Sequence, residues 1–324
     1  MDNAKEKKNL GAIIGEYGAY IALALLVVVI SCISPEFRTG SNLLNLLRQA
    51  SFNGLIAFGM TCVILSDGID LSVGSTFALS AIICAELLVK GIPSFIAILI
   101  ALVAGVLLGC ISGILVTKGR LQPFIATLIT MTAYRGLALI ITDGKPISRL
   151  AEVAKGSFFF KLFGKGNVLY FNKISVPIPA FIFVIALLIF WFVLSKTTFG
   201  RKIYATGSND KCAKLVGVDV HKIRISVYAI SGFTSALAGI IMISRVNSAQ
   251  PTLGTGYELD AIAAVALGGT SMSGGRGKIV GTFVGVLIIA VLNNGLNILG
   301  VSTYYQEVIK AAVILVAVLS DRKR

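Results

Sequence analysis

Long apolar runs recur along almost the whole chain and constrain its fold more than any other feature. A helix needs about 20 apolar residues to cross a bilayer, and its backbone polar groups must be satisfied within the segment. Hydrophobic residues make up 56% of the chain and charged residues only 14%, which excludes an ordinary soluble domain. We therefore expect an all-α, polytopic membrane bundle. The clear apolar runs cover residues 17–33, 51–65, 74–89, 95–116, 124–142, 177–194, 225–244, 279–293 and 308–319.

A tenth apolar segment, 258–268, is short. Its wholly apolar core, 261–267, rises only about 10 Å as a helix, which is too little to cross a bilayer alone. It must include flanking residues or enter the membrane and return. The expected architecture is one transmembrane domain over residues 1–324, with about ten segments and discontinuous elements rich in glycine and serine.

Lysine and arginine are unevenly distributed between the loops of such a bundle. With ten spans, the segments on one side, which include the tail 1–16, segment 195–224 and the C-terminus, carry 17 lysines and arginines, and the opposite side carries 10. Because cytoplasmic loops are the lysine- and arginine-rich ones, we expect both termini and segment 195–224 to be cytoplasmic. The same bias accounts for the net charge of +14, so nucleic acid is not expected as a partner.

Segment 143–176 falls on the opposite, external side in this arrangement. It combines Phe158, Phe159 and Phe160 with several lysines. Phenylalanine and lysine together are typical of segments that lie at a membrane surface. Two interpretations stay open for this segment: a connector with an interfacial amphipathic piece, which the composition slightly favours, or a docking surface for an external partner.

The cytoplasmic segment 195–224 contains the pattern of a short capped helix over residues 210–216. Ser208 or Asn209 can cap its start, and Gly217 provides a stop. Helical spacing places Cys212, Leu215 and Val216 on one side, which makes a small apolar face on a basic loop. Lipid headgroups or a groove of a cytoplasmic subunit could cover this face, and the pattern does not decide between them.

The apolar pattern is interrupted sharply at residues 66–75. Non-helical backbone at membrane depth persists only where protein or a water-filled cavity satisfies it, so this break indicates an element of a transport path. An ordinary short loop is the alternative, since glycine and serine also mark turns. Asp70 is equally open to two roles, a helix cap at the start of the next run or a direct contact with the substrate. The interruption reads Ser66-Asp67-Gly68-Ile69-Asp70-Leu71-Ser72-Val73-Gly74-Ser75.

A second glycine-rich break covers residues 266–278. It resembles a phosphate-binding loop only superficially, because that motif would need glycine at Met272 and serine or threonine at Ile279. A nucleotide site in this chain is therefore not expected. His221 is the single histidine, so we also expect no metal site, no cofactor and no catalytic constellation.

Five motifs in the same order give the chain a family resemblance that runs from about residue 40 to the C-terminus. Together they resemble the membrane permease of ribose-, xylose- and galactose-type ABC importers. The segment 213–217 is also similar to the loop by which importer permeases contact their ATPase, although it lacks a glutamate just upstream. The motifs are Gly59-Met60-Thr61, residues 68–75, Gly200-Arg201 with Ala205-x-Gly207, residues 213–217 and residues 266–277.

The resemblance implies a particular assembly in a bacterial inner membrane. Two permease subunits would form a path at their interface, a cytoplasmic ATPase would supply the energy, and an external sugar-binding protein would deliver the substrate. The expected ATPase contacts are Asn209, Ala213, Leu215 and Gly217. The expected residues of the path or its gate are Gly68, Asp70, Ser72, Gly74, Gly268, Gly269, Ser271 and Gly274.

Two other classes of function compete with this interpretation. A secondary transporter driven by an ion gradient needs carboxylates within the membrane, and only Asp67, Asp70 and Glu86 are candidates. A membrane enzyme needs a catalytic constellation, which the sequence does not offer. Arg135 lies inside an apolar run and should face the bundle interior or extend to the outer surface. Its short distance from the outer end of the run favours the second.

Overall fold

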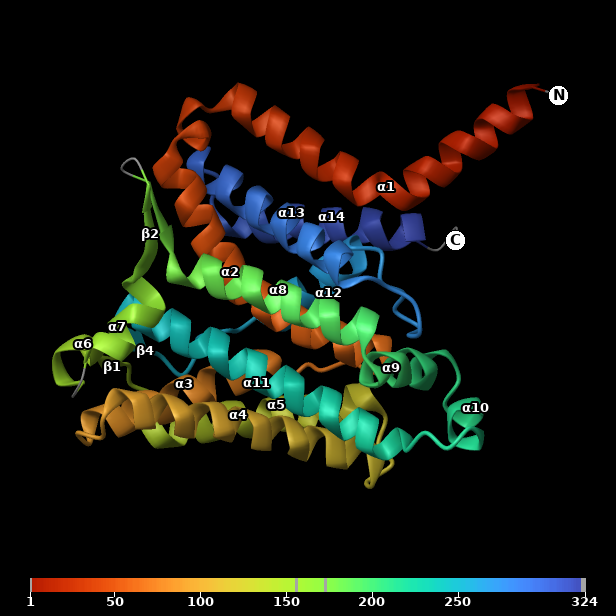
Figure 1. Cartoon of the computed structure of the whole chain (residues 1–324). Coiled ribbons are helices and arrows are strands. Elements are labelled where there is room, and N and C mark those ends of the chain that lie inside the picture. Colours follow the sequence, from red (N-terminus) through yellow and green to blue (C-terminus); the bar gives the residue numbers. More distant parts are fainter. Residues whose placement is uncertain (1, 155–156, 172–173, 322–324) are drawn as a thin grey trace.

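The computed structural model describes residues 2–154, 157–171 and 174–321 of the chain. Its helices lie side by side and run between two ends of one bundle (Figure 1). The first half contains α1 (Asp2–Ile33), the 3-10 helix η1 (Pro35–Arg38), α2 (Gly40–Leu65), α3 (Val73–Val89), α4 (Ser94–Thr117) and α5 (Pro123–Thr142). The second half contains α8 (Ile178–Lys196), α9 (Thr198–Ser208), α10 (Asp210–Leu215), α11 (Val220–Val246), α12 (Tyr257–Leu267), α13 (Ile279–Ile298) and α14 (Thr303–Asp321).

Five of the described helices, α4, α5, α8, α11 and α13, are long and apolar enough to cross a membrane. Shorter apolar helical stretches are Tyr17–Ile33 of α1 and all of α3. The buried fraction of each helix shows whether it lies at the centre or at the edge of the bundle. The apolar windows of α11 and α13 are 61% and 72% buried, whereas that of α4 is 33% buried. The first two therefore form the centre of the bundle, and α4 presents an apolar face to the outside.

Small residues let the central helices approach closely. Gly105, Gly109 and Gly113 of α4 face α11, where a Cβ atom at each position would overlap atoms of Gly232, Tyr228 or Ile225. Helices within a membrane gain little hydrophobic free energy from associating with each other. Close van der Waals packing along such a stripe of small residues stabilises their contact instead. Aromatic stacking adds to it on the other side of the core, where Phe183 of α8 lies 5.2 Å from the rings of both Phe58 and Phe283.

Two small sheets complete the fold at the end opposite α9 and α10 (Figure 1). Segment 143–176 contributes β1 (Ile147–Ser148), α6 (Leu150–Val153), α7 (Ser157–Lys165) and the strands β2 (Asn167–Phe171) and β3 (Ile174–Pro177). β1 pairs antiparallel with β4 (Ser248–Ala249), and β2 pairs with β3. The expectation of a purely helical chain missed these strands, which satisfy backbone groups where the chain leaves its helices.

Candidate functional site

The predicted interruption between two apolar runs is confirmed as a break between α2 and α3. α2 ends at Leu65, and the chain regains helical geometry only at Val73. The carbonyl oxygen of Ile69, in the middle of the break, accepts hydrogen bonds from Tyr228 Oη at 3.1 Å and Thr127 Oγ1 at 3.3 Å. Side chains of α11 and α5 thus donate hydrogen bonds to a backbone carbonyl that has no partner within a helix. A break within a membrane bundle requires such partners.

Asp70 is buried at the centre of this break, with 1% of its surface exposed. Its Oδ1 atom accepts hydrogen bonds from the backbone N–H of Ser72 at 3.0 Å and from Ser72 Oγ at 2.6 Å. Its Oδ2 atom accepts one from Ser231 Oγ at 2.8 Å. Three donors enclose the carboxyl group, so in this conformation it fixes the break against α11 and is closed to any molecule in a path.

A chain of hydroxyl groups continues from this carboxyl group. Ser72 Oγ lies 3.4 Å from Ser112 Oγ on α4, which in turn donates to Thr130 Oγ1 on α5 at 3.1 Å. All three hydroxyl-bearing residues are buried. Buried polar groups are stable only when they are paired, so the network specifies how four elements pack around the break.

A further break, residues 247–256, was not recognised from the sequence and faces the break 66–75. Gly74, in the first turn of α3, packs so closely that a Cβ atom would overlap the carbonyl oxygen of Gly254. That hypothetical atom would also lie 2.5 Å from Glu258 Oε2. Phe77 of α3 meets Tyr257 of α12 edge to face at 5.4 Å. The N-terminal ends of α3 and α12 therefore meet inside the bundle. The signal in the sequence was the spacing of Pro251, Gly254 and Gly256.

Arg135 stabilises the break 247–256 by hydrogen bonds to its backbone. Its Nη1 atom donates to the carbonyl oxygens of Pro251 and, at 2.8 Å, Leu253. The preference for an outward extension of Arg135 was wrong, because two backbone carbonyls that the break leaves free accept its hydrogen bonds within the protein.

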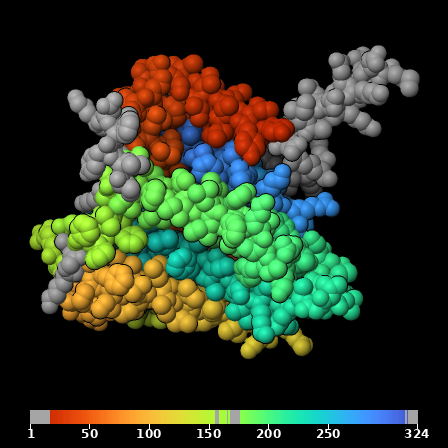
Figure 2. Space-filling model, in the orientation of Figure 1, coloured from red at the N-terminus to blue at the C-terminus, as the bar shows by residue number. Residues whose placement is uncertain are grey.

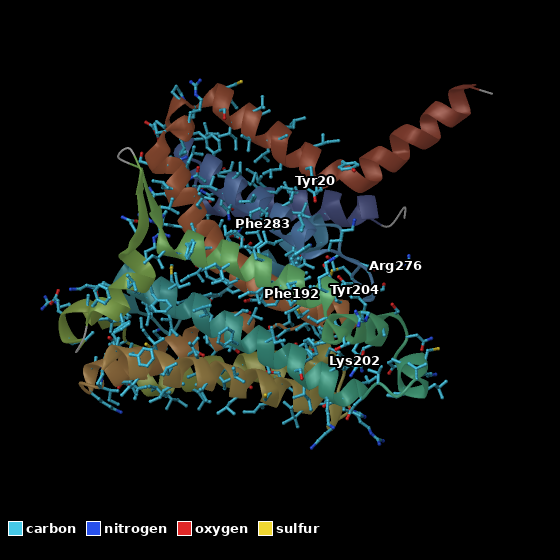
Figure 3. All side chains as sticks on the ribbon, viewed as in Figure 1. Tyr20, Phe192, Lys202, Tyr204, Arg276 and Phe283 are labelled. Carbon is cyan, nitrogen blue, oxygen red and sulfur yellow. The ribbon has the colours of Figure 1, made fainter. Side chains whose placement is uncertain are left out.

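The glycine-rich segment 268–278 forms the connection between α12 and α13, as predicted, at the end of the bundle that carries α9. The N–H of Gly275 donates to the carbonyl oxygen of Leu65 at 3.0 Å, which joins this segment to the end of α2. Tyr204 Oη of α9 donates to the carbonyl oxygen of Gly277 at 2.9 Å. Figure 3 shows Tyr204 and Arg276 close to one another at this end.

The predicted gate residues therefore separate into two places. Asp70, Ser72 and Gly74 lie inside the bundle, at the start of α3. Gly268, Gly269, Ser271 and Gly274 lie at the end of the bundle, where Gly268 packs against Gly281 and Gly274 against Asp67. Gly68 is next to Tyr228 and connects the two places.

The short helix in segment 195–224 is confirmed as α10. Asn209 Oδ1 accepts the N–H of Cys212 at 3.0 Å, which is an N-cap, and Gly217 ends the helix at a φ of +82°. Leu215 and Val216 are 87% and 79% exposed, whereas Ala213 is buried. α10 thus offers two uncovered aliphatic side chains at the tip of the loop beyond α9, at the right of Figure 2.

Comparison with known proteins decides the family. The model of the family described as "Branched-chain amino acid transport system / permease component" matches residues 42–318. The chain belongs to this permease family. It is a multi-pass inner membrane protein of the permease class.

Three curated proteins are similar to the chain over almost its whole length. The ribose import permease protein RbsC of Bacillus subtilis is 50% identical over 100% of this chain and 98% of its own length. The D-allose permease AlsC of Escherichia coli is 40% identical over 98% and 96%. The L-arabinose permease AraH of the same organism is 36% identical over 98% and 94%.

Proposed function

We propose that the chain is the membrane permease of an ATP-binding-cassette importer that carries a monosaccharide, either a ribose-like pentose or a hexose. The observation that carries the proposal is the 50% identity to a ribose import permease over the full length of this chain. The relatives named for allose and arabinose support a sugar, although the family description mentions amino acids.

The proposed topology has ten membrane segments: α1, α2, α3, α4, α5, α8, α11, α12, α13 and α14. The single domain would span residues 1–324, with the tail 1–16 and segment 195–224 in the cytoplasm and segment 143–176 outside. Support comes from α9 and α10 lying at the end of the bundle opposite α6 and α7 (Figure 1). Lysine and arginine are concentrated around the same end.

The proposed ATPase contact is α10. Leu215 is the main anchor because its side chain is almost fully exposed, and Asn209 and Gly217 set the two ends of the helix. Ala213 supports the helix from beneath. The partners are a cytoplasmic ATPase, an external sugar-binding protein and a second copy of this chain, with the sugar path between the two copies. Gly68, Asp70, Ser72 and Gly74 shape the interior of each copy, and Gly268, Gly269, Ser271 and Gly274 shape its cytoplasmic gate.

The first test is purification of the tagged chain in mild detergent from its native host, followed by mass spectrometry of the proteins that co-purify. An ATPase of the cassette type should accompany the natural chain and be lost with Leu215→Asp. Val153→Asp is the matched control, because Val153 is an exposed aliphatic residue on α6 at the other end. If no ATPase accompanies the natural chain even after crosslinking, the proposal fails.

The runner-up, a secondary transporter driven by an ion gradient, gives a different result in transport assays. Sugar uptake should stop when ATP is depleted and should persist when an uncoupler dissipates the ion gradient while ATP is maintained. The orientation has its own test in Cys212, which is exposed on α10. In a Cys32→Ser background, a membrane-impermeant maleimide should label Cys212 in inside-out vesicles and not in intact cells.

A further inference from the structure

A basic pocket of about 490 Å³ lies beside α10, and Arg224 in its lining reaches Asp67 of the break 66–75. It is formed by the connection between α4 and α5, by Lys214 of α10 and by the first turns of α11. These three elements lie together at the lower right of Figure 1. The basic side chains that line it are Arg120, Lys214, Arg224 and His221.

The charges around this pocket are only partly balanced. Asp67 Oδ2 lies 3.9 Å from Arg224 Nη2, and Asp210 Oδ2 lies 3.6 Å from Lys214 Nζ. The described residues that line the pocket include no carboxylate, and no ion pair to Arg120 occurs within the described part of the chain. The site therefore keeps an excess of positive charge, which an anion would neutralise.

Free hydrogen-bond donors point to the same kind of ligand. Arg224 Nε is buried and has no hydrogen-bond partner among the residues that the structure describes. Val220 and His221, in the first turn of the 27-residue helix α11, also line the pocket. The N-terminal end of a helix favours negative charge, and at α11 Asp219 already caps it by accepting the N–H of Lys222 at 3.0 Å. An oxyanion would satisfy the orphaned guanidinium donor of Arg224.

The surroundings indicate where the anion comes from. Leu121 lines the pocket, and Phe124 and Ile125 follow it on α5 with 54% and 44% of their surfaces exposed. On α4, Ile111 and Ile114 are 46% and 40% exposed. Apolar side chains of two membrane helices thus lead up to a cluster of cations. That is the arrangement in which a phospholipid places its acyl chains along the helices and its headgroup among the cations.

We propose that this pocket binds the phosphate group of an anionic phospholipid. The bound headgroup bridges Arg120 on the α4–α5 connection and Lys214 on α10. It thereby ties the helix proposed to contact the ATPase to the adjacent pair of membrane helices. The part of the inference that concerns α10 rests on the proposed function, whereas binding itself does not.

The test is lipid binding to the purified full-length chain in detergent, measured by native mass spectrometry with phosphatidylglycerol added against phosphatidylcholine. The test variant is Arg120→Gln with Lys214→Gln, which removes two exposed charges and leaves the half-buried Arg224 in place. The control is Arg201→Gln with Lys202→Gln, which removes two exposed charges from α9. Loss of two charge-assisted contacts should weaken phosphatidylglycerol binding at least about tenfold in the test variant only.

Further arms distinguish the source of the anion and the role of charge. Inorganic phosphate and glycerol phosphate are added in place of lipid, with the thermal midpoint of unfolding as the readout. A rise of the midpoint with phosphatidylglycerol but not with either soluble anion supports the lipid. An equal rise with a soluble anion shows a free-phosphate site and overturns the lipid assignment. Equal binding of both lipids, or equal weakening in both variants, overturns the proposal. None of these readouts depends on an ATPase or on transport.

Discussion

Replacement of Gly74 by alanine tests whether α3 and the break 247–256 pack as closely as the structure shows. The added Cβ atom would overlap the backbone carbonyl oxygen of Gly254, and backbone cannot rotate away as a flexible side chain can. Over-packing of this kind costs about 1–3 kcal/mol. Alanine also favours a helix over glycine by up to ~1 kcal/mol, which offsets part of the loss.

Gly136→Ala is the matched control, because Gly136 lies in α5 and its added Cβ would have no neighbour within 4 Å. Both variants replace a glycine within a helix by alanine, so their difference reports chiefly the overlap at Gly74. The assay is thermal unfolding of each purified variant in the same detergent. We expect a midpoint several degrees lower for Gly74→Ala than for Gly136→Ala. Equal midpoints would refute the close approach of α3 and the segment 247–256.

Substitutions at three further positions probe the polar contacts of the breaks 66–75 and 247–256 and the start of α11. Ser231→Ala removes one donor to Asp70 and should cost about 1–3 kcal/mol in unfolding free energy, measured by denaturant titration in detergent. Arg135→Leu leaves two backbone carbonyls without a donor and should cost a similar ~1–3 kcal/mol, whereas Arg135→Lys should retain part of the contact in the same titration. The backbone N–H at the start of α11 holds the pKa of Asp219 below its usual value. The cap therefore stabilises the fold at neutral pH, and its contribution is lost as the pH falls through this lowered pKa. Asp219→Asn, which can still cap, should remove this part of the pH dependence of the thermal midpoint.

Local signals in the sequence were sufficient for the short elements. The capped helix α10 was predicted because Asn209 and Gly217 act on backbone within a few residues of themselves. The break after α2 was predicted because serine, aspartate and glycine are concentrated in one stretch of an otherwise apolar sequence. Such signals require no knowledge of the rest of the chain.

Long-range partners could not be predicted in the same way. Ser231 is 161 residues from Asp70, and nothing near either residue indicates that they form a hydrogen bond. Arg135 was misplaced for the same reason. Its distance along the helix to the outer surface could be counted, but the carbonyls that it binds lie 116 and 118 residues further along. The polar contacts that define the centre of the bundle are therefore a property of the tertiary structure.

The contacts of α9 distinguish the glycine-rich segment 268–278 from the breaks 66–75 and 247–256 deeper in the bundle. Only Asn209 separates α9 from α10, so a force on α10 acts directly on α9. Gly207 of α9 packs against the carbonyl oxygen of Leu65 and the N–H of Gly275, which are themselves hydrogen-bonded. A shift of α9 must therefore move the end of α2 and the α12–α13 connection together. The inner contact between Gly74 and Gly254 has no such direct link to α10. We infer that the glycine-rich segment 268–278 transmits motion, whereas the break 66–75, fixed by Asp70, and the break 247–256, fixed by Arg135, keep α3 and α12 in register while it occurs.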